Sequence, residues 1–161
     1  MTGFVEGWAS GDILTIRYYP NGDTAWVRTY GGSGSGLDTG LGVAVDDSGN
    51  VYVAGPSTGS GTGFDYTTIK YDSTGSIAWV ETYDGPANGS DWLTTMRIDG
   101  TGNVYVTGSS QQTASNADYL TIKYTQTQFL RGDANGDDII NVGDIVYLVS
   151  YLYKGGPEPV C

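Results

Sequence analysis

The sequence contains no histidine and only one cysteine, Cys161, which is its last residue. Without histidine, Ser-His-Asp catalysis, Cys-His catalysis and imidazole zinc sites are excluded. Basic residues are also scarce, because 7 lysines and arginines stand against 18 acidic residues and give a formal net charge of −11. This charge argues against nucleic acid or an anionic membrane as a partner, and it favours the binding of cations.

Long apolar runs are missing as well. No stretch of about 18 apolar residues occurs, so we predict no membrane span. Residues 1–7 lack the basic and apolar regions of a secretion signal, but a processed signal or an incomplete gene would leave the same pattern. Glycine, in contrast, is abundant, and its 26 copies predict numerous turns.

What the sequence has instead is a pattern that recurs at a fixed interval. The segment 12–18 returns as 65–71 and again as 118–124, so the period is 53 residues (65 − 12 and 118 − 65). Other landmarks keep the same step: Trp26 and Trp79, Tyr30 and Tyr83, Asp46 and Asp99, Val51 and Val104, Gly55 and Gly108. A period of this length indicates one supersecondary unit copied in tandem, with its apolar face buried against its neighbours.

Each period predicts four short strands, which in the second unit cover 66–71, 77–83, 92–98 and 104–108. Tyr, Thr, Val, Ile and Trp fill these segments, and Gly, Asp and Asn mark the turns between them. We therefore expect a mainly β fold. It consists of two four-stranded antiparallel propeller-like blades plus an extra strand over 119–124, with a small C-terminal calcium loop and helix. The predicted domains are a repeat region over 1–128 and the loop and helix over 129–161.

Three motifs carry a resemblance to a known family: Asp-x-x-Thr-Ile-Lys-Tyr, Ala-Trp-Val-x-Thr-Tyr and Gly-Asn-Val-Tyr-Val-x-Gly. The region 12–124 that contains them resembles the bacterial beta-propeller repeats labelled SBBP. The resemblance implies a surface or secreted protein whose repeat has no fixed activity. Closed propellers have about four to eight blades, so three interpretations stay open: a fragment of a longer propeller, several chains sharing one ring, or an open array that stacks from chain to chain.

The segment after Gln128 has a different character and contains the candidate metal site. Between residues 133 and 144, acidic or amide side chains occupy positions 1, 3, 5, 9 and 12 of a loop, as in an EF-hand-type calcium loop. Calcium takes six to eight oxygen ligands, and alternate positions of a tight loop supply them. The predicted ligands are Asp133, Asn135, Asp137, the carbonyl of Ile139, Asn141 (directly or through water) and Asp144. The alternative interpretation is a solvated acidic turn.

Two positions of this loop depart from the usual pattern. Asp138 stands at position 6, where such loops usually have glycine, and Asp144 replaces the usual glutamate at position 12. Both departures are expected to weaken the affinity for calcium.

An apolar stripe with helical spacing follows the loop: Ile145, Leu148, Val149 and Leu152. Loop and helix together resemble one half of a type I dockerin, the calcium-binding module that attaches proteins to cohesin partners. A complete dockerin has two halves, and Val142 and Gly143 stand where cohesin-binding dockerins often have Ser and Thr. The apolar helix is expected to pack on the repeat array, on a second copy of itself or on the next chain.

Two functional hypotheses follow. The first is a non-enzymatic extracellular or cell-surface structural protein that binds calcium and assembles with copies of itself, through edge-strand and helix contacts, into an oligomer or filament. The alternative is a glycan- or protein-binding propeller fragment of a larger secreted protein, attached to a scaffold through its dockerin-like tail. Because Asp12, Asp65 and Asp118 repeat, we expect structural roles for them, and we expect Trp26 and Trp79 in the core.

Overall fold

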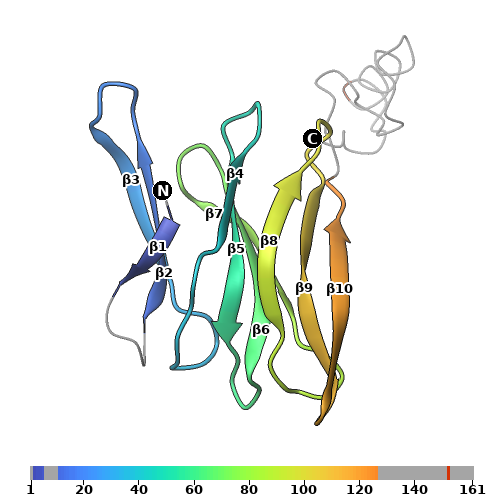
Figure 1. Ribbon diagram of the computed structural model, residues 1–161. Helices are drawn as coiled ribbons and strands as arrows, with labels where there is room; N and C mark the ends of the chain where they lie inside the picture. Colours follow the sequence, from blue (N-terminus) through green and yellow to red (C-terminus); the bar gives the residue numbers. More distant parts are fainter. Residues whose placement is uncertain (1, 6–10, 127–151, 153–161) are drawn as a thin grey trace. The chain divides into compact units, whose positions relative to one another are not determined.

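The computed structural model describes residues 2–5, 11–126 and 152 (Figure 1). All regular secondary structure within residues 2–5 and 11–126 is β-strand, which confirms the mainly β prediction. The strands are β1 (Thr2–Val5), β2 (Asp12–Tyr18), β3 (Thr24–Tyr30), β4 (Gly42–Val45), β5 (Val51–Thr58), β6 (Phe64–Tyr71), β7 (Ile77–Tyr83), β8 (Trp92–Ile98), β9 (Val104–Thr113) and β10 (Asn116–Tyr124). The strand expected over 119–124 is present within β10, but it is not an extra strand, because it pairs with β9 as a member of the third sheet.

These strands form three antiparallel sheets. The first sheet has the order β1-β2-β3, the middle sheet β4-β5-β6-β7 and the third sheet β8-β9-β10. Every connection within a sheet joins neighbouring strands, and the chain passes to the next sheet after β3 and after β7. Figure 1 shows the three sheets following one another along the chain.

The observed grouping of strands differs from the predicted one. The prediction placed the first strand of a period, such as β6, in one blade with the three strands that follow it. In the structure, β6 and β7 belong with β4 and β5 of the preceding period, because β5 and β6 pair over their whole length, from Val51↔Tyr71 to Thr58↔Phe64. The period was therefore correct, but the point in each period where the chain changes sheets was not.

Aspartate-centred turns connect neighbouring strands and repeat with the period. In the turn before β5, Asp46 accepts hydrogen bonds from the backbone of Ser48 and Asn50 at 3.0 and 2.9 Å, and from the Tyr52 hydroxyl at 2.9 Å. Asp99 makes the equivalent bonds to Thr101, Asn103 and Tyr105 one period later. These carboxylates are engaged by their own turns, so their role is structural.

Glycine recurs in β5 and β9 because the backbone of a neighbouring segment passes very close. A Cβ atom at Gly55 would lie 1.7 Å from the carbonyl oxygen of Thr39, and one at Gly108 would lie 2.1 Å from that of Trp92. No side chain fits at such distances. The repeated glycine therefore permits the segment before β4 to approach β5 closely, and the start of β8 to approach β9 closely.

The three sheets are joined by two apolar cores. The first junction, between the first and middle sheets, is formed by Ile13, Trp26, Val51, Val53, Ile69 and Tyr71. The second junction, between the middle and third sheets, is formed by Tyr52, Ala54, Tyr66, Leu93, Met96, Val104 and Val106, with Trp79 packed against them. Trp26 is 7% exposed. The predicted core positions of Trp26 and Trp79 are thus confirmed.

The chain divides into the units Met1–Tyr124 and Thr125–Cys161. The sheets belong to the first. Among the residues that the structure describes, no helix is long and apolar enough to cross a membrane.

Candidate functional site

The predicted calcium loop lies outside the described residues. This applies to Asp133, Asn135, Asp137, Ile139, Asn141 and Asp144, and to the helix that follows them apart from Leu152. The calcium site therefore stays a prediction from the sequence.

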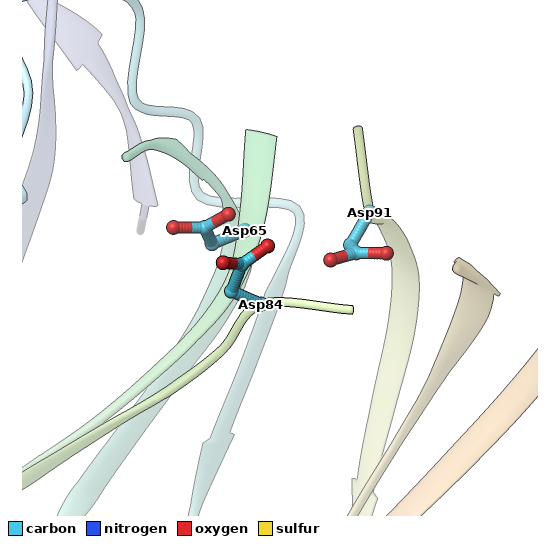
Figure 2. A group of neighbouring side chains, drawn as sticks. All are labelled: Asp65, Asp84 and Asp91. Carbon is cyan, nitrogen blue, oxygen red and sulfur yellow. The ribbon is translucent and has the colours of Figure 1, made fainter. Parts of the chain in front are cut away.

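Within the described residues, three carboxylates come together at the end of the middle sheet. Asp65 is the second residue of β6, Asp84 follows β7, and Asp91 precedes β8. One carboxylate oxygen of each lies within 4.8 Å of those of the other two. Figure 2 shows Asp65 and Asp84 beside each other, with Asp91 facing them from the segment that leads into the third sheet. We call these residues the carboxylate cluster.

Backbone N–H groups position Asp91 within the cluster. Its side chain is fully buried and accepts hydrogen bonds from the backbone N–H of Gly85 and, at 2.9 Å, from that of Gln111. Two N–H donors offset much of the cost of burying this carboxylate. Asp91 thereby ties the loop after β7 to β9 of the third sheet.

Asp65 is held less completely. The Thr62 hydroxyl donates to one of its oxygens at 3.1 Å, while its other oxygen is buried without a hydrogen-bond partner among the described residues. Burial raises the pKa of Asp65, and the nearby charges of Asp84 and Asp91 raise it further, against the lowering effect of Thr62. The ionised form of Asp65 is therefore disfavoured at this position.

The cluster repeats only in part at the first junction. Asp12 and Asp38 stand one period before Asp65 and Asp91, but the position equivalent to Asp84 is Gly31. Asp38 is 1% exposed, and it accepts hydrogen bonds from the Ser57 hydroxyl and, at 2.9 Å, from the backbone of Thr58. Sequence reasoning noticed the first aspartate of each set and missed the second, although the 53-residue step between Asp38 and Asp91 was there to be read.

Asp118, the third repeat of Asp12, has no such surroundings. It is exposed, pairs with Ser110 across the β9–β10 ladder, and accepts a hydrogen bond from the Asn116 amide at 3.3 Å.

The chemistry open to the carboxylate cluster is that of an oxygen-only site. Carboxylates are the ligands that hard cations such as calcium prefer, but with one oxygen from each, the three side chains supply only three of the six to eight oxygens that calcium takes. Two of the oxygens also already accept backbone hydrogen bonds. The cluster by itself is therefore not a calcium cage.

A shallow hollow of about 530 Å³ lies between two loops of the first and middle sheets. It is lined by Ser33, Gly34, Ser35, Gly36, Thr58, Gly59, Ser60 and Gly61. These residues offer hydroxyl and backbone groups and no acid or base.

The described fold is thus a mainly β array of antiparallel sheets that repeat with the sequence. Residues 25–61 match the family model of the SBBP beta-propeller repeat. The matched segment begins in β3 and ends after β5, so it spans the crossing from the first sheet to the middle sheet. No curated protein matches the chain significantly. The resemblance of the C-terminal segment to a dockerin remains a prediction.

Proposed function

We propose that this protein is a non-enzymatic, extracellular structural protein that binds calcium and assembles with copies of itself. The observation that carries the proposal is the repetition of one sheet type, whose members pack face to face through apolar cores. Repeat arrays of this kind gain stability at each interface between neighbours. A repeated unit with accessible end surfaces is suited to continue that stacking from one copy to the next.

Strand β10 offers one route to assembly. It is one of the two edge strands of the third sheet in the part of the chain that the structure describes. An edge strand presents backbone N–H and C=O groups that can pair with another chain. The predicted apolar helix after the calcium loop would offer a second contact.

The loop 133–144 is the part of the chain that we propose binds calcium. Its acidic residues would repel one another without a cation, and the net charge of −11 favours cation binding by the whole chain. Asp133, Asn135, Asp137, Ile139, Asn141 and Asp144 would hold the ion. Calcium would then order the loop and the helix that follows it.

The experiment is sedimentation velocity of the full chain in millimolar calcium and after chelation, together with calorimetric calcium titration. We expect species larger than the 17.0 kDa chain in calcium, and smaller ones after chelation. D133A should weaken calcium binding, whereas D47A, which changes an exposed acidic residue in a repeat turn, should not. If the chain is strictly monomeric in calcium, the proposed self-assembly is wrong. If wild type and D133A bind calcium equally, the loop 133–144 is not the calcium site.

A second candidate function is supported by the match of residues 25–61 to a propeller repeat. The chain would then be a glycan- or protein-binding portion of a larger propeller, attached to a scaffold by its dockerin-like tail. Further repeats in register within the same reading frame would favour this function. Binding of a soluble glycan to the isolated chain would test it directly.

A further inference from the structure

Each internal junction is made from two unlike faces. We call the face of a sheet that is turned toward the next sheet along the chain its leading face, and the opposite one its trailing face. At the first junction, Trp26 of the leading face lies against Tyr71 of the trailing face, with ring centroids 5.6 Å apart. At the second junction, Trp79 and Tyr124 repeat this pair at 5.9 Å. The chain therefore builds the same heterologous contact twice.

Two such faces have no sheet against them in the part of the chain that the structure describes. They are the trailing face of the first sheet and the leading face of the third sheet. Each is equivalent, by its position in the repeat, to a face that is covered at an internal junction.

The trailing face of the first sheet has the apolar residues of a junction but leaves them exposed. Tyr18 is 49% exposed, whereas Tyr71, one period later, is fully buried. Val27 is 46% exposed, whereas its equivalent Val80 packs against the first core. Both pairs of residues occupy the same register, including the irregularity that precedes Tyr18 and Tyr71. The exposed surface is therefore a junction surface by sequence and by geometry.

The leading face of the third sheet shows the same contrast. Tyr119 is 80% exposed, whereas its equivalents Tyr66 and Ile13 are fully buried in the second and first junctions. Lys123 lies over the Tyr105 ring at 5.4 Å, as Lys70 lies over the Tyr52 ring at 5.1 Å. This face thus repeats the tyrosine and lysine positions of the middle sheet, whereas the position equivalent to Trp79 is Gly132, so the tryptophan of the aromatic pair is not repeated there.

Arg17, on the leading face of the first sheet, also reaches two turns of the middle sheet. At the first junction, Arg17 donates from Nη1 to the carbonyl oxygens of Gly49 and Ser73, at 3.0 and 2.7 Å. Lys123 stands two periods after Arg17. The turn of the first sheet that is equivalent to the one containing Ser73 is Tyr19–Asp23.

The turn Tyr19–Asp23 has the backbone geometry that such a contact needs. Tyr19 N–H donates to the Asp23 carbonyl at 2.8 Å, as Asp72 N–H does to that of Ser76 at 2.8 Å. A second copy would therefore present to Lys123 the carbonyl of Pro20, the equivalent of the Ser73 carbonyl.

We propose that the leading face of the third sheet docks on the trailing face of the first sheet of a second copy, so that copies join head to tail. This inference rests on the proposed self-assembly and specifies its surfaces. The second copy is the occupant because the matching half of the junction is present on the same chain. A head-to-tail contact is heterologous, and it produces a ring if the rotation closes and a filament if it does not. Two copies bring twice three sheets, a number within the range of closed propellers.

The test uses one variant on each face, V27D and Y119D, analysed by sedimentation velocity under conditions in which the wild type assembles. Each aspartate would place a charge in a contact that buries apolar surface. We expect each variant alone to sediment as a 17.0 kDa monomer. L41D is the matched control, because Leu41 is 45% exposed and lies in the loop before β4, on neither face. Circular dichroism and thermal unfolding establish that all three variants fold.

Mixing the two variants gives the sharpest result. V27D keeps an intact leading face and Y119D keeps an intact trailing face, so an equimolar mixture should form a one-to-one dimer and nothing larger. If V27D and Y119D each assemble by themselves as well as wild type does, the face contact is wrong. Self-assembly would then have to use the β10 edge or the C-terminal helix. Two monomeric variants that do not complement each other when mixed would also overturn the face contact. A monomeric wild type would overturn the proposed function itself.

Discussion

The first and second junctions both pack a tryptophan of one sheet against a tyrosine of the next sheet. Trp26 with Tyr71 and Trp79 with Tyr124 have centroid distances of 5.6 and 5.9 Å and interplanar angles of 42° and 45°. The pair is held within a few tenths of an ångström although the residues around it differ. A contact that is reproduced in this way is a property of the repeat and does not depend on one local environment.

The buried residues next to this aromatic pair differ between the two junctions. Ile13 at the first junction is replaced by Tyr66 at the second, and both side chains are fully buried. The Tyr66 hydroxyl has no hydrogen-bond partner among the residues that the structure describes, and burial followed by the charge of Asp91 raises its pKa to about 12. At this one position, the second junction therefore contains a buried hydroxyl where the first junction has an apolar side chain.

The carboxylates at the ends of the junctions differ most. Asp38 keeps one buried oxygen without a partner in the described part of the chain, whereas both oxygens of Asp91 accept backbone hydrogen bonds. Gly31 becomes Asp84, which adds a third carboxylate at the second junction only. The two internal junctions therefore share their aromatic packing, whereas the polar groups around it differ.

The largest expected effect comes from removing core volume at each junction. Ile69 is fully buried in the first core, and its equivalent Ile122 is only partly buried against the second. I69A should lower the free energy of unfolding by about 2–5 kcal/mol, because a buried apolar side chain is lost and a cavity remains. I122A should cost less. Urea denaturation of both variants measures the difference, and equal losses would show that exposure does not distinguish the junctions.

A smaller, pH-dependent effect is expected at Asp38. Burial raises its pKa above the usual value of 3.8, hydrogen bonds from Ser57 and Thr58 oppose this, and the charge of Asp12 adds to it. A raised pKa stabilises the fold at pH values below 3.8, and this contribution is lost as the pH rises through the folded-state pKa. In D38N that decline in the free energy of unfolding should be absent.

Asp46 serves as a control for this experiment, because its effect on the free energy of unfolding should change with pH in the opposite direction. Burial opposes its ionisation, but hydrogen bonds from Asn50 and Tyr52 and the charge of Lys70 lower its pKa overall. D46N should therefore remove a contribution that is present above pH 3.8 and lost as the pH falls. Urea denaturation between about pH 3 and 7 measures both variants. Parallel pH profiles for wild type and D38N would contradict the assignment to Asp38.

The smallest effect is expected from making the second carboxylate set resemble the first. D84N removes one of the charges that raise the pKa of Asp65. With chelator present at neutral pH, the free energy of unfolding should rise by less than about 1 kcal/mol, because the repulsion is partly screened by solvent. D47N, far from the cluster, should leave it unchanged. A clear loss of stability in D84N would show that Asp84 supports the loop in another way.

Much of the local structure could be predicted from the sequence. The bounds of β7 and β8 agree with the prediction at both ends. In each case a segment of residues that favour strands is flanked by Gly, Asp or Pro. The predicted burial of Trp26 also agrees, since an aromatic residue repeated inside a strand pattern indicates a core position. Such features depend on residues close together in the chain.

The grouping of strands and the carboxylate cluster could not be obtained in this way. A period states how often a unit returns, but not where in each unit the chain leaves one sheet for the next. Asp65 and Asp84 meet because β6 and β7 pair in a register that places Tyr66 opposite Tyr83, and Asp91 faces them from the segment before β8. No spacing rule for metal or acid sites connects these three positions.

The 53-residue period, the β class, the turns and the core positions of Trp26 and Trp79 follow from the sequence alone, because each depends on local preference or on repetition. Which strands share a sheet, which carboxylates meet and which faces stay exposed are set by the packing of the whole fold. These depend on hydrogen bonding and packing between segments tens of residues apart. Tyr18, Tyr71 and Tyr124 are the same residue in the repeat, and packing alone makes the first exposed, the second buried and the third partly buried.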